Sequence, residues 1–146
     1  FTPLDGVAQR NMDSVWSAYS SSKGQPLKLE IHGRTTTLPL HSHGVGRGSF
    51  SSLCEQPLGA ADYLAIADAV EVLLLDNVPL LTREQAGPAK RFVTLVDALY
   101  EAKVRFICSA AAEPEKLFEE GDGAFEFERT ASRLREMAGA EWAAQG

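Results

Sequence analysis

The sequence predicts an α/β fold built on a parallel-sheet βαβ core, with an N-terminal helix and a β-hairpin before it. The first observation is a continuous apolar run over residues 72–75 that ends in Asp76 and Asn77. The second is an apolar run over 104–108 that ends in Ser109, and the third is a helical pattern between the two runs. Because a crossover helix joins parallel strands, the two runs are predicted to be neighbouring buried strands.

Length and composition are those of one ordinary globular domain. The chain has 146 residues, of which 45% are hydrophobic and 23% charged. We expect a helix and linker over 1–24, a hairpin over 25–43, and an α/β core with a C-terminal helix over 44–146. The net charge of −6 argues against a general binder of nucleic acids or of anionic membranes.

The cysteine content favours a reducing, cytoplasmic setting, because Cys54 and Cys108 do not make a disulfide framework. No run approaches the roughly 20 apolar residues that a membrane-spanning helix needs. The chain opens on Phe1 rather than Met and enters structure at once, so we expect a fragment cut from a longer protein.

The first predicted element is an amphipathic helix. Thr2 is its predicted N-cap, Pro3 its first residue and Asp5 its capping-box residue. Its apolar face is formed by Leu4, Ala8, Met12, Val15, Trp16 and Tyr19. Residues 20–24 are predicted to be a connector. The clean alternation over 27–32, a turn at Gly33 and Arg34, and a return over 35–40 predict a β-hairpin.

A glycine-rich stretch follows over residues 44–49. A phosphate-binding loop needs backbone N–H groups around the phosphates, a lysine and a hydroxyl for Mg²⁺. Glycines and Ser49 are present, but the chain contains no Gly-Lys-Ser or Gly-Lys-Thr. We therefore predict a mobile loop and no working Walker A motif.

His41 and His43 are two residues apart, which would put them on one side of an extended segment. Metal sites need further ligands, and no third Cys, His or Asp lies at ligand spacing. No metal site is predicted.

The middle of the chain is predicted to be mainly helical. Residues 50–56 form a short element, and 60–69 form a helix with Tyr63, Ile66 and Ala67 inward. The crossover helix is predicted to begin near Pro88. Its apolar face consists of Phe92, Val93, Leu95, Val96, Leu99 and Tyr100.

After the second strand, a short helix is predicted from Pro114 and a polar loop over 119–123. The alternation over 124–128 predicts a short strand, and 129–138 a helix with Ala131, Leu134 and Met137 or Ala138 inward. Arg129 and Arg133 are four residues apart and share a face of that helix. The tail is predicted to fray, with Trp142 as a possible anchor.

Four blocks of sequence together resemble one protein family. They are FSSLCEQPLGAADYL at 50–64, DNVP at 76–79, KRFVTLVDALY at 90–100 and FERTASRLREM at 127–137. The chain is similar over essentially its whole length to the C-terminal half of ZapE-type (AFG/LACE-like) AAA+ ATPases, a bacterial cell-division family with mitochondrial relatives. The last block is the most specific of the four.

The resemblance implies a protein that binds and hydrolyses ATP with Mg²⁺ when it is complete. In that family the Walker A and main Walker B motifs lie in an N-terminal half outside this chain, so the fragment alone is not expected to hold ATP or Mg²⁺. The implied partners are that N-terminal half, further copies of the protein, and a cell-division protein such as FtsZ. The implied location is the bacterial cytoplasm, at the periphery of the inner membrane or at the division site.

The resemblance also suggests roles for the strand-end residues. Asp76 matches a Walker-B-like acid, Asn77 stands where a catalytic Glu would follow, and Ser109 stands where a sensor residue would end its strand. These three would be a degenerate nucleotide-binding set, and residues 44–118 would be a worn second copy of an ATPase core. The favoured alternative for Asp76 is a turn or N-cap carboxylate before Pro79.

Arg129 and Arg133 are the candidate catalytic residues, as an arginine finger or sensor that reaches a nucleotide held elsewhere. The alternative is a salt-bridged helix face with Glu126 and Glu136 nearby. Lys90 and Arg91 are weaker candidates for the same role.

Two hypotheses of function follow. The chain is either the C-terminal region of an AAA+ ATPase that contributes such groups and partner contacts, or a non-catalytic α/β interaction module with decayed nucleotide chemistry. A Ser–His hydrolase finds little support, because no Gly-x-Ser-x-Gly elbow exists.

Overall fold

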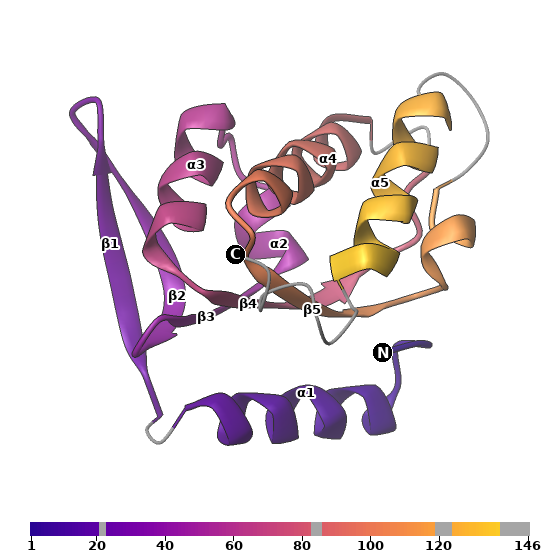
Figure 1. The fold of residues 1–146 in the computed structure, drawn as a ribbon, viewed down its shortest axis with the longest axis horizontal. Coiled ribbons are helices and arrows are strands. Elements are labelled where there is room, and N and C mark those ends of the chain that lie inside the picture. Colours follow the sequence, from indigo (N-terminus) through magenta and orange to yellow (C-terminus); the bar gives the residue numbers. More distant parts are fainter. Residues whose placement is uncertain (21–22, 83–85, 119–123, 138–146) are drawn as a thin grey trace.

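The computed structural model contains one five-stranded mixed sheet with helices on both faces (Figure 1). It describes residues 1–20, 23–82, 86–118 and 124–137, with side chains in the last range from Phe127 onward. The strand order is β1-β2-β3-β4-β5, with antiparallel pairs from β1 to β3 and parallel pairs from β3 to β5. The strands are β1 (Gln25–Ile31), β2 (Arg34–Ser42), β3 (Val45–Ser49), β4 (Val72–Val78) and β5 (Arg105–Ala110).

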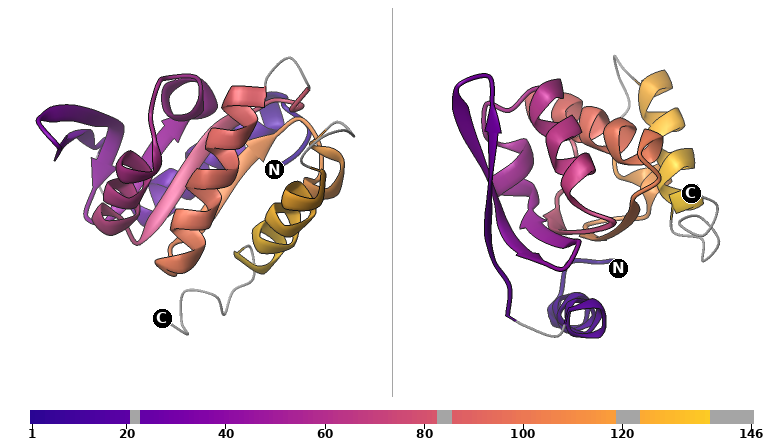
Figure 2. Two further views of the ribbon diagram at one scale, coloured as in Figure 1. Left: turned by 90° about the horizontal axis from the view of Figure 1, so that it is seen from above. Right: turned by 60° about the vertical axis from the view of Figure 1, so that its left-hand side comes forward.

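The helices cover the two faces unequally. Helix α1 (Gly6–Tyr19) lies alone on one face of β3–β5, and the other described helices lie on the opposite face (Figures 1 and 2). Those helices are α2 (Phe50–Cys54), α3 (Ala60–Ala69), α4 (Ala86–Glu101), the 3₁₀ turn η2 (Pro114–Lys116) and α5 (Ala124–Met137). The predicted α/β class with a parallel βαβ core is confirmed.

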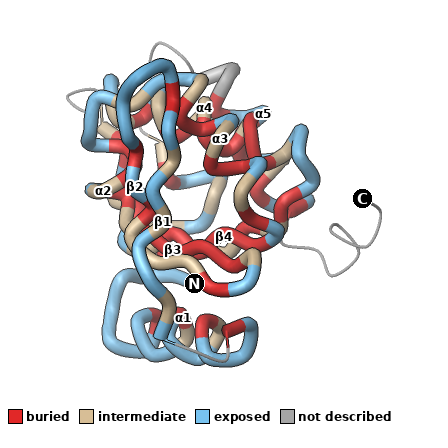
Figure 3. The backbone as a smooth tube through the Cα atoms, turned by 90° about the vertical axis from the view of Figure 1, so that its left-hand side faces the viewer, coloured by how far each residue is buried: buried red, intermediate tan, exposed pale blue. Residues whose placement is uncertain are grey.

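The apolar run of β4 is continuous because the strand is buried on both faces. Leu73 and Leu75 belong to the larger core under α2–α5, whereas Val72 and Leu74 pack with Met12 and Trp16 of α1. Figure 3 shows the same division, with buried strands between a largely exposed α1 and the helical layer. In the described part of the chain, no helix is both long enough and apolar enough to cross a membrane.

Helix α1 begins later than the sequence predicts. Its N-cap is Asp5, whose carboxylate accepts a hydrogen bond from the Ala8 N–H at 2.9 Å. The expected N-cap, Thr2, instead donates a hydrogen bond to Glu113, and Phe1 makes main-chain hydrogen bonds with Cys108 and Ala110 at the end of β5. The carboxylate of Asp5 caps the helix itself, so Thr2, three residues earlier, is not needed as the N-cap.

The predicted hairpin is confirmed, with its turn one residue earlier than expected. His32 and Gly33 both have left-handed backbones, at φ 49° and 83°, and Arg34 already belongs to β2. Two positive φ angles in a two-residue connection are the type I′ geometry that matches the twist of the strands.

The prediction of a mobile loop over 44–49 is wrong, because Val45–Ser49 is the central strand β3. Its glycines are a packing requirement rather than a sign of mobility. A Cβ on Gly46 would lie 2.7 Å from Leu38 and 2.9 Å from Val70. Only a residue without a side chain lets these neighbours close over the strand.

The predicted strand over 124–128 is also wrong, because α5 begins at Ala124. The buried positions of α5 are Phe127, Thr130, Ala131, Leu134 and Met137, which follow the three- and four-residue spacing of a helix. Phe127 stacks on Phe118 with ring centres 4.8 Å apart, so burial against a helix face outweighs the local alternation. The predicted polar loop 119–123, Ala138 and the Trp142 tail lie outside the described residues.

Candidate functional site

The carboxyl ends of β3, β4 and β5 bring polar residues to one edge of the parallel sheet. In the β3–β4 register, Ser49 lies opposite Asp76, and Ser109 lies at the same end of β5. This edge is where ligands bind in open α/β sheets. The structure therefore gathers Asp76, Asn77 and Ser109, the three residues that the sequence singles out at the strand ends.

These three residues form a β-bulge inside the sheet rather than a turn after it. Leu75 pairs with Cys108 and Val78 with Ala110, so Asp76 and Asn77 together face the single residue Ser109. Asn77 has a left-handed backbone, with φ 64°, and its N–H donates to the Ser109 hydroxyl at 2.8 Å. The expectation that Asp76 is a turn or N-cap carboxylate is corrected, because β4 continues through it to Val78.

Arg47 of β3 binds the carboxylate of Asp76. Its Nε and Nη2 donate to the two Asp76 oxygens at 2.7 and 3.0 Å, and Nη2 also donates to Asp13 of α1 at 2.9 Å. The Arg47 and Asp76 side chains are only 10% and 13% exposed. The hydrogen bonds that Arg47 donates to Asp76 raise the pKa of the Arg47 guanidinium despite its burial, so this cation is permanent.

Sequence reasoning did not find Arg47, because its segment was interpreted as a loop. A signal was present in the strand alternation, which places Arg47 on the same face as Ser49. The parallel register then puts Asp76 opposite Ser49, so the arginine and the acid share that face. In the structure, both oxygens of Asp76 accept from this arginine.

No phosphate loop separates β3 from α2. The strand ends at Ser49 and the helix starts at Phe50. The Ser49 hydroxyl caps the Ser52 N–H at 3.0 Å, and the Ser52 hydroxyl accepts from the Ser49 N–H at 2.9 Å. The N–H groups that a phosphate would use are therefore partly engaged by serines of the same turn.

A second polar cluster lies on α5. Asp97 of α4 accepts from Arg133 at 2.5 Å and from Arg129 at 3.2 Å. The Arg133 guanidinium also lies over the Tyr100 ring, 4.4 Å from its centre, and the Tyr100 hydroxyl donates to Glu136 at 2.9 Å. The charged partner that the two arginines share is thus Asp97 of the neighbouring helix α4.

The structure does not bring the two sets of predicted site residues together. Asp76 directs its carboxylate to Arg47, which also reaches Asp13 of α1 on one face of the sheet. Arg129 and Arg133 lie on α5, which covers the other face (Figure 1). Arg129 keeps 49% of its side chain exposed and Arg133 22%. Lys90 and Arg91 lie in the first half of α4, where Arg91 donates to the Cys54 carbonyl at 3.0 Å.

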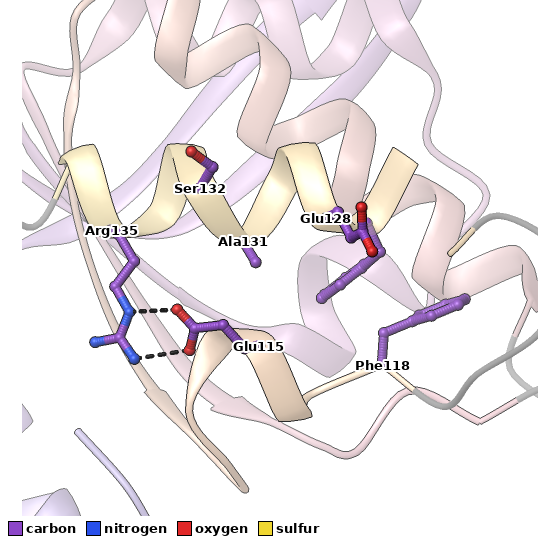
Figure 4. A pocket seen from close by; sticks show the side chains of 7 residues that line it. Glu115, Phe118, Glu128, Ala131, Ser132 and Arg135 are labelled. Atoms are coloured by element: carbon purple, nitrogen blue, oxygen red, sulfur yellow. Dashed lines mark hydrogen bonds and ion pairs between the residues drawn. The ribbon is translucent and has the colours of Figure 1, made fainter. Parts of the chain in front are cut away.

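A cavity of about 550 Å³ lies beside α5, on the side of Arg135. Arg135 makes a two-pronged ion pair with Glu115 at 2.7 Å for both bonds, and the stacked rings of Phe118 and Phe127 form the other wall (Figure 4). The Arg135 guanidinium lowers the pKa of the Glu115 carboxyl to about 2. Arg135 therefore pairs with an acid of η2, whereas Arg129 and Arg133 pair with Asp97 of α4.

The histidines do not converge on a metal site. His41 places Nε2 3.3 Å from the Ala69 carbonyl oxygen, and His43 has a left-handed backbone in the turn before β3. Within the described ranges, no group of three Cys, His, Asp or Glu residues could hold a metal ion together.

Comparison with known proteins gives consistent matches. The family model described as AFG1-like ATPase matches residues 1–145. The Escherichia coli cell division protein ZapE is 33% identical over 97% of this chain and 38% of its own length. The zebrafish lactation elevated protein 1 homolog B is 38% identical over 77% of this chain and 22% of its own length. The chain thus spans well under half the length of these relatives, and no solved structure matches it.

Proposed function

Because this chain belongs to the AFG1-like ATPase family, we propose that it is the C-terminal region of an AAA+ ATPase and does not hydrolyse ATP alone. In the complete protein it supplies arginine groups to a nucleotide bound elsewhere, and it supplies contacts to partners. ATP and Mg²⁺ are held by the remaining part of the polypeptide. The observation that carries this proposal is a contrast between two sites. The Asp76 carboxylate at the strand ends is already bound by Arg47, whereas Arg129 and Arg133 on α5 remain partly exposed.

At the strand ends, the features that a nucleotide needs are missing or already used. Both carboxylate oxygens of Asp76 accept hydrogen bonds from Arg47, and the glycine-rich segment is a buried strand without a lysine. A Mg²⁺ site usually combines one or two carboxylates with the phosphates of the substrate. These contacts support a structural role for Asp76 and for the hydrogen bond between Asn77 and Ser109.

At α5, two cations are held in place and remain accessible. Asp97 and the Tyr100 ring orient Arg133, and Arg129 is half exposed beside it. A guanidinium that meets the transferring phosphate raises turnover by about 10³–10⁵. Orientation by an acid and a ring lowers the entropy that the arginine loses on reaching a phosphate, so this pair suits a trans-acting role.

The test compares α5 arginines in the complete ATPase. Arg133→Ala and Arg129→Ala are measured for kcat at saturating ATP, with Arg135→Ala as the matched control, since Arg135 pairs with Glu113 and Glu115 instead. We expect Arg133→Ala to lower kcat about 10³-fold with unchanged ATP affinity and the control to stay near wild type. Equal turnover in Arg133→Ala and the control would remove the arginine role.

The isolated chain provides a second test. Titration with ATP and Mg²⁺, followed by calorimetry, is expected to give no binding. Clear binding by this chain would contradict the proposal that its site is incomplete.

The alternative is a non-catalytic interaction module with decayed nucleotide chemistry. The cavity beside Arg135, with its stacked phenylalanines, favours a role in partner contact. The E. coli relative is named a cell division protein, so a division protein such as FtsZ is the first partner to test, together with further copies of the ATPase. Such a protein would act in the bacterial cytoplasm, at the inner membrane or the division site.

A further inference from the structure

The edge of the sheet at β5 has an outward row of main-chain groups. β5 is the last strand in the order of the described sheet. The Arg105 N–H donates inward to the Glu71 carbonyl at 3.0 Å, and Ile107 is registered with Leu74 of β4. Because alternate residues of a parallel strand direct their N–H and C=O groups to opposite sides, Phe106 and Cys108 direct theirs outward.

Phe1 already occupies one position along this edge. Its amino group donates to the Cys108 carbonyl at 2.6 Å, and its carbonyl accepts from the Ala110 N–H at 2.8 Å. Two bonds that flank Ser109 in this way are one rung of a parallel ladder. They fix the direction of any strand that leads into Phe1, which must run parallel to β5 from its Arg105 end.

A groove of about 370 Å³ follows the same edge. Its apolar wall includes Phe106, Cys108, Leu117 and Leu134, and it is also lined by Arg105. The Nε of Arg105 is buried and has no hydrogen-bond partner among the described residues. A buried donor without an acceptor is unfavourable, so this edge favours an occupant that brings an oxygen to Arg105.

We propose that the outer edge of β5 binds one extended strand that runs parallel to β5 and leads into Phe1. Its source is the part of the AAA+ ATPase polypeptide that this chain does not cover. This inference rests on the proposed function. It also draws on the length of the relatives. The match covers 38% of the E. coli protein, so the other 62% of that protein includes residues that could supply such a strand.

The pairing of Phe1 with Ser109 determines which residues of the added strand lie opposite each residue of β5. The residue two positions before Phe1 lies opposite Ile107, where its N–H reaches the Phe106 carbonyl and its carbonyl reaches the Cys108 N–H. Its side chain is on the Arg105 face of the sheet, so an acidic residue there supplies the acceptor that Nε lacks. The residues before and after it direct their side chains to the face of Phe106 and Cys108, where apolar groups fit.

The experiment adds this strand to the protein. One version of the chain carries Thr-Val-Asp-Val before Phe1, and a matched version carries Thr-Gly-Pro-Gly, which has little strand propensity and lacks the N–H two positions before Phe1. Amide hydrogen exchange is measured for Phe106 and Cys108, with Ile107 as the internal reference because it faces β4. We expect the first extension to slow exchange of both outward amides at least about tenfold and the second to leave them unchanged.

Equal exchange in all versions would overturn the proposal, and so would concentration-dependent protection of the unextended chain, which would assign the edge to a second copy. The complete E. coli relative tests the source of the strand. Its amides aligned with Phe106 and Cys108 should be protected, and fast exchange there would overturn the assignment. None of these readouts uses ATP, so failure of the arginine role would appear in kcat while amide protection persisted.

Discussion

Arg47 binds both carboxylate oxygens of Asp76 across the boundary between β3 and β4. The same guanidinium reaches Asp13 on α1, so one buried cation connects two strands and a helix. Replacement of Arg47 by Met leaves Asp76 largely buried without its partner. Because removal of one member of a buried pair costs about 3–5 kcal/mol, we expect the free energy of unfolding to fall by about 3 kcal/mol. Urea unfolding measures this loss.

Two further variants check this explanation. Asp13 is 58% exposed, so Asp13→Asn should cost less than about 1 kcal/mol. The double change Arg47→Met with Asp76→Leu should recover part of the stability, because neither charge is then left alone. A double variant no more stable than Arg47→Met would count against the unpaired carboxylate as the cause.

Gly46 is predicted to tolerate no side chain. Its added Cβ would lie within 3 Å of Leu38 and Val70, and both of these residues are buried. Gly46→Ala should therefore destabilise the fold by about 1–3 kcal/mol, as overpacking does. At Gly59 the nearest atom to a Cβ is 3.9 Å away, so Gly59→Ala is the matched control and should cost less. Thermal unfolding of the two variants distinguishes steric conflict from a general intolerance of alanine.

Asp62 is predicted to make the free energy of unfolding fall at low pH. Burial acts to raise the pKa of its carboxyl, but hydrogen bonds from Thr36, Gly59 and Arg34 outweigh burial and lower the pKa below its ordinary value. The ionised form therefore stabilises the fold. Its contribution is complete above the unfolded pKa of about 3.9 and is lost as the pH falls through the lower folded pKa.

Unfolding in urea between about pH 5 and pH 2 measures this effect. We expect Asp62→Asn to be less stable at pH 5 and to lose less stability on acidification than the unchanged protein. Asp68→Asn, an exposed change on the same helix, should leave the slope intact. Parallel curves for the Asp62 variant and the unchanged chain would contradict the assignment.

The contact of Asp97 with the α5 arginines is predicted to be modest in energy. The Asp97 side chain is 32% exposed, so Asp97→Ala should lower the free energy of unfolding by about 1 kcal/mol. A double-mutant cycle with Arg133→Ala should give a larger coupling than one with Arg129→Ala, because Arg133 is nearer and less exposed. Equal coupling energies would contradict this expectation, because they would mean that Asp97 interacts equally strongly with Arg129 and Arg133.

The sequence was sufficient where burial imposes a simple pattern. β4 and β5 were predictable because strands covered on both faces read as apolar runs, and the meeting of Asp76 with Ser109 followed from their position at parallel strand ends. β3 was not, because Gly46 serves the close approach of Leu38 and Val70, and those neighbours are known only from the fold.

The ion pairs were beyond local pattern for a related reason. Arg133 pairs with Asp97, 36 residues away on another helix, and Arg47 pairs with Asp76, 29 residues away on another strand. Charge spacing along one helix predicts possible pairs but not the geometry of a second helix packed beside it. The start of α5 was missed because Phe127 has its partner in Phe118, outside the helix.

The unequal cover of the sheet has a consequence for the order in which the molecule opens. Helix α1 is attached through the stripe of Ala8, Met12 and Trp16 and through Asp13, while most of its other residues are exposed. Elements with few buried contacts open at lower free energy than the global transition. We therefore expect α1 to detach as its own unit while strand β4 and the layer of α2–α5 stay folded.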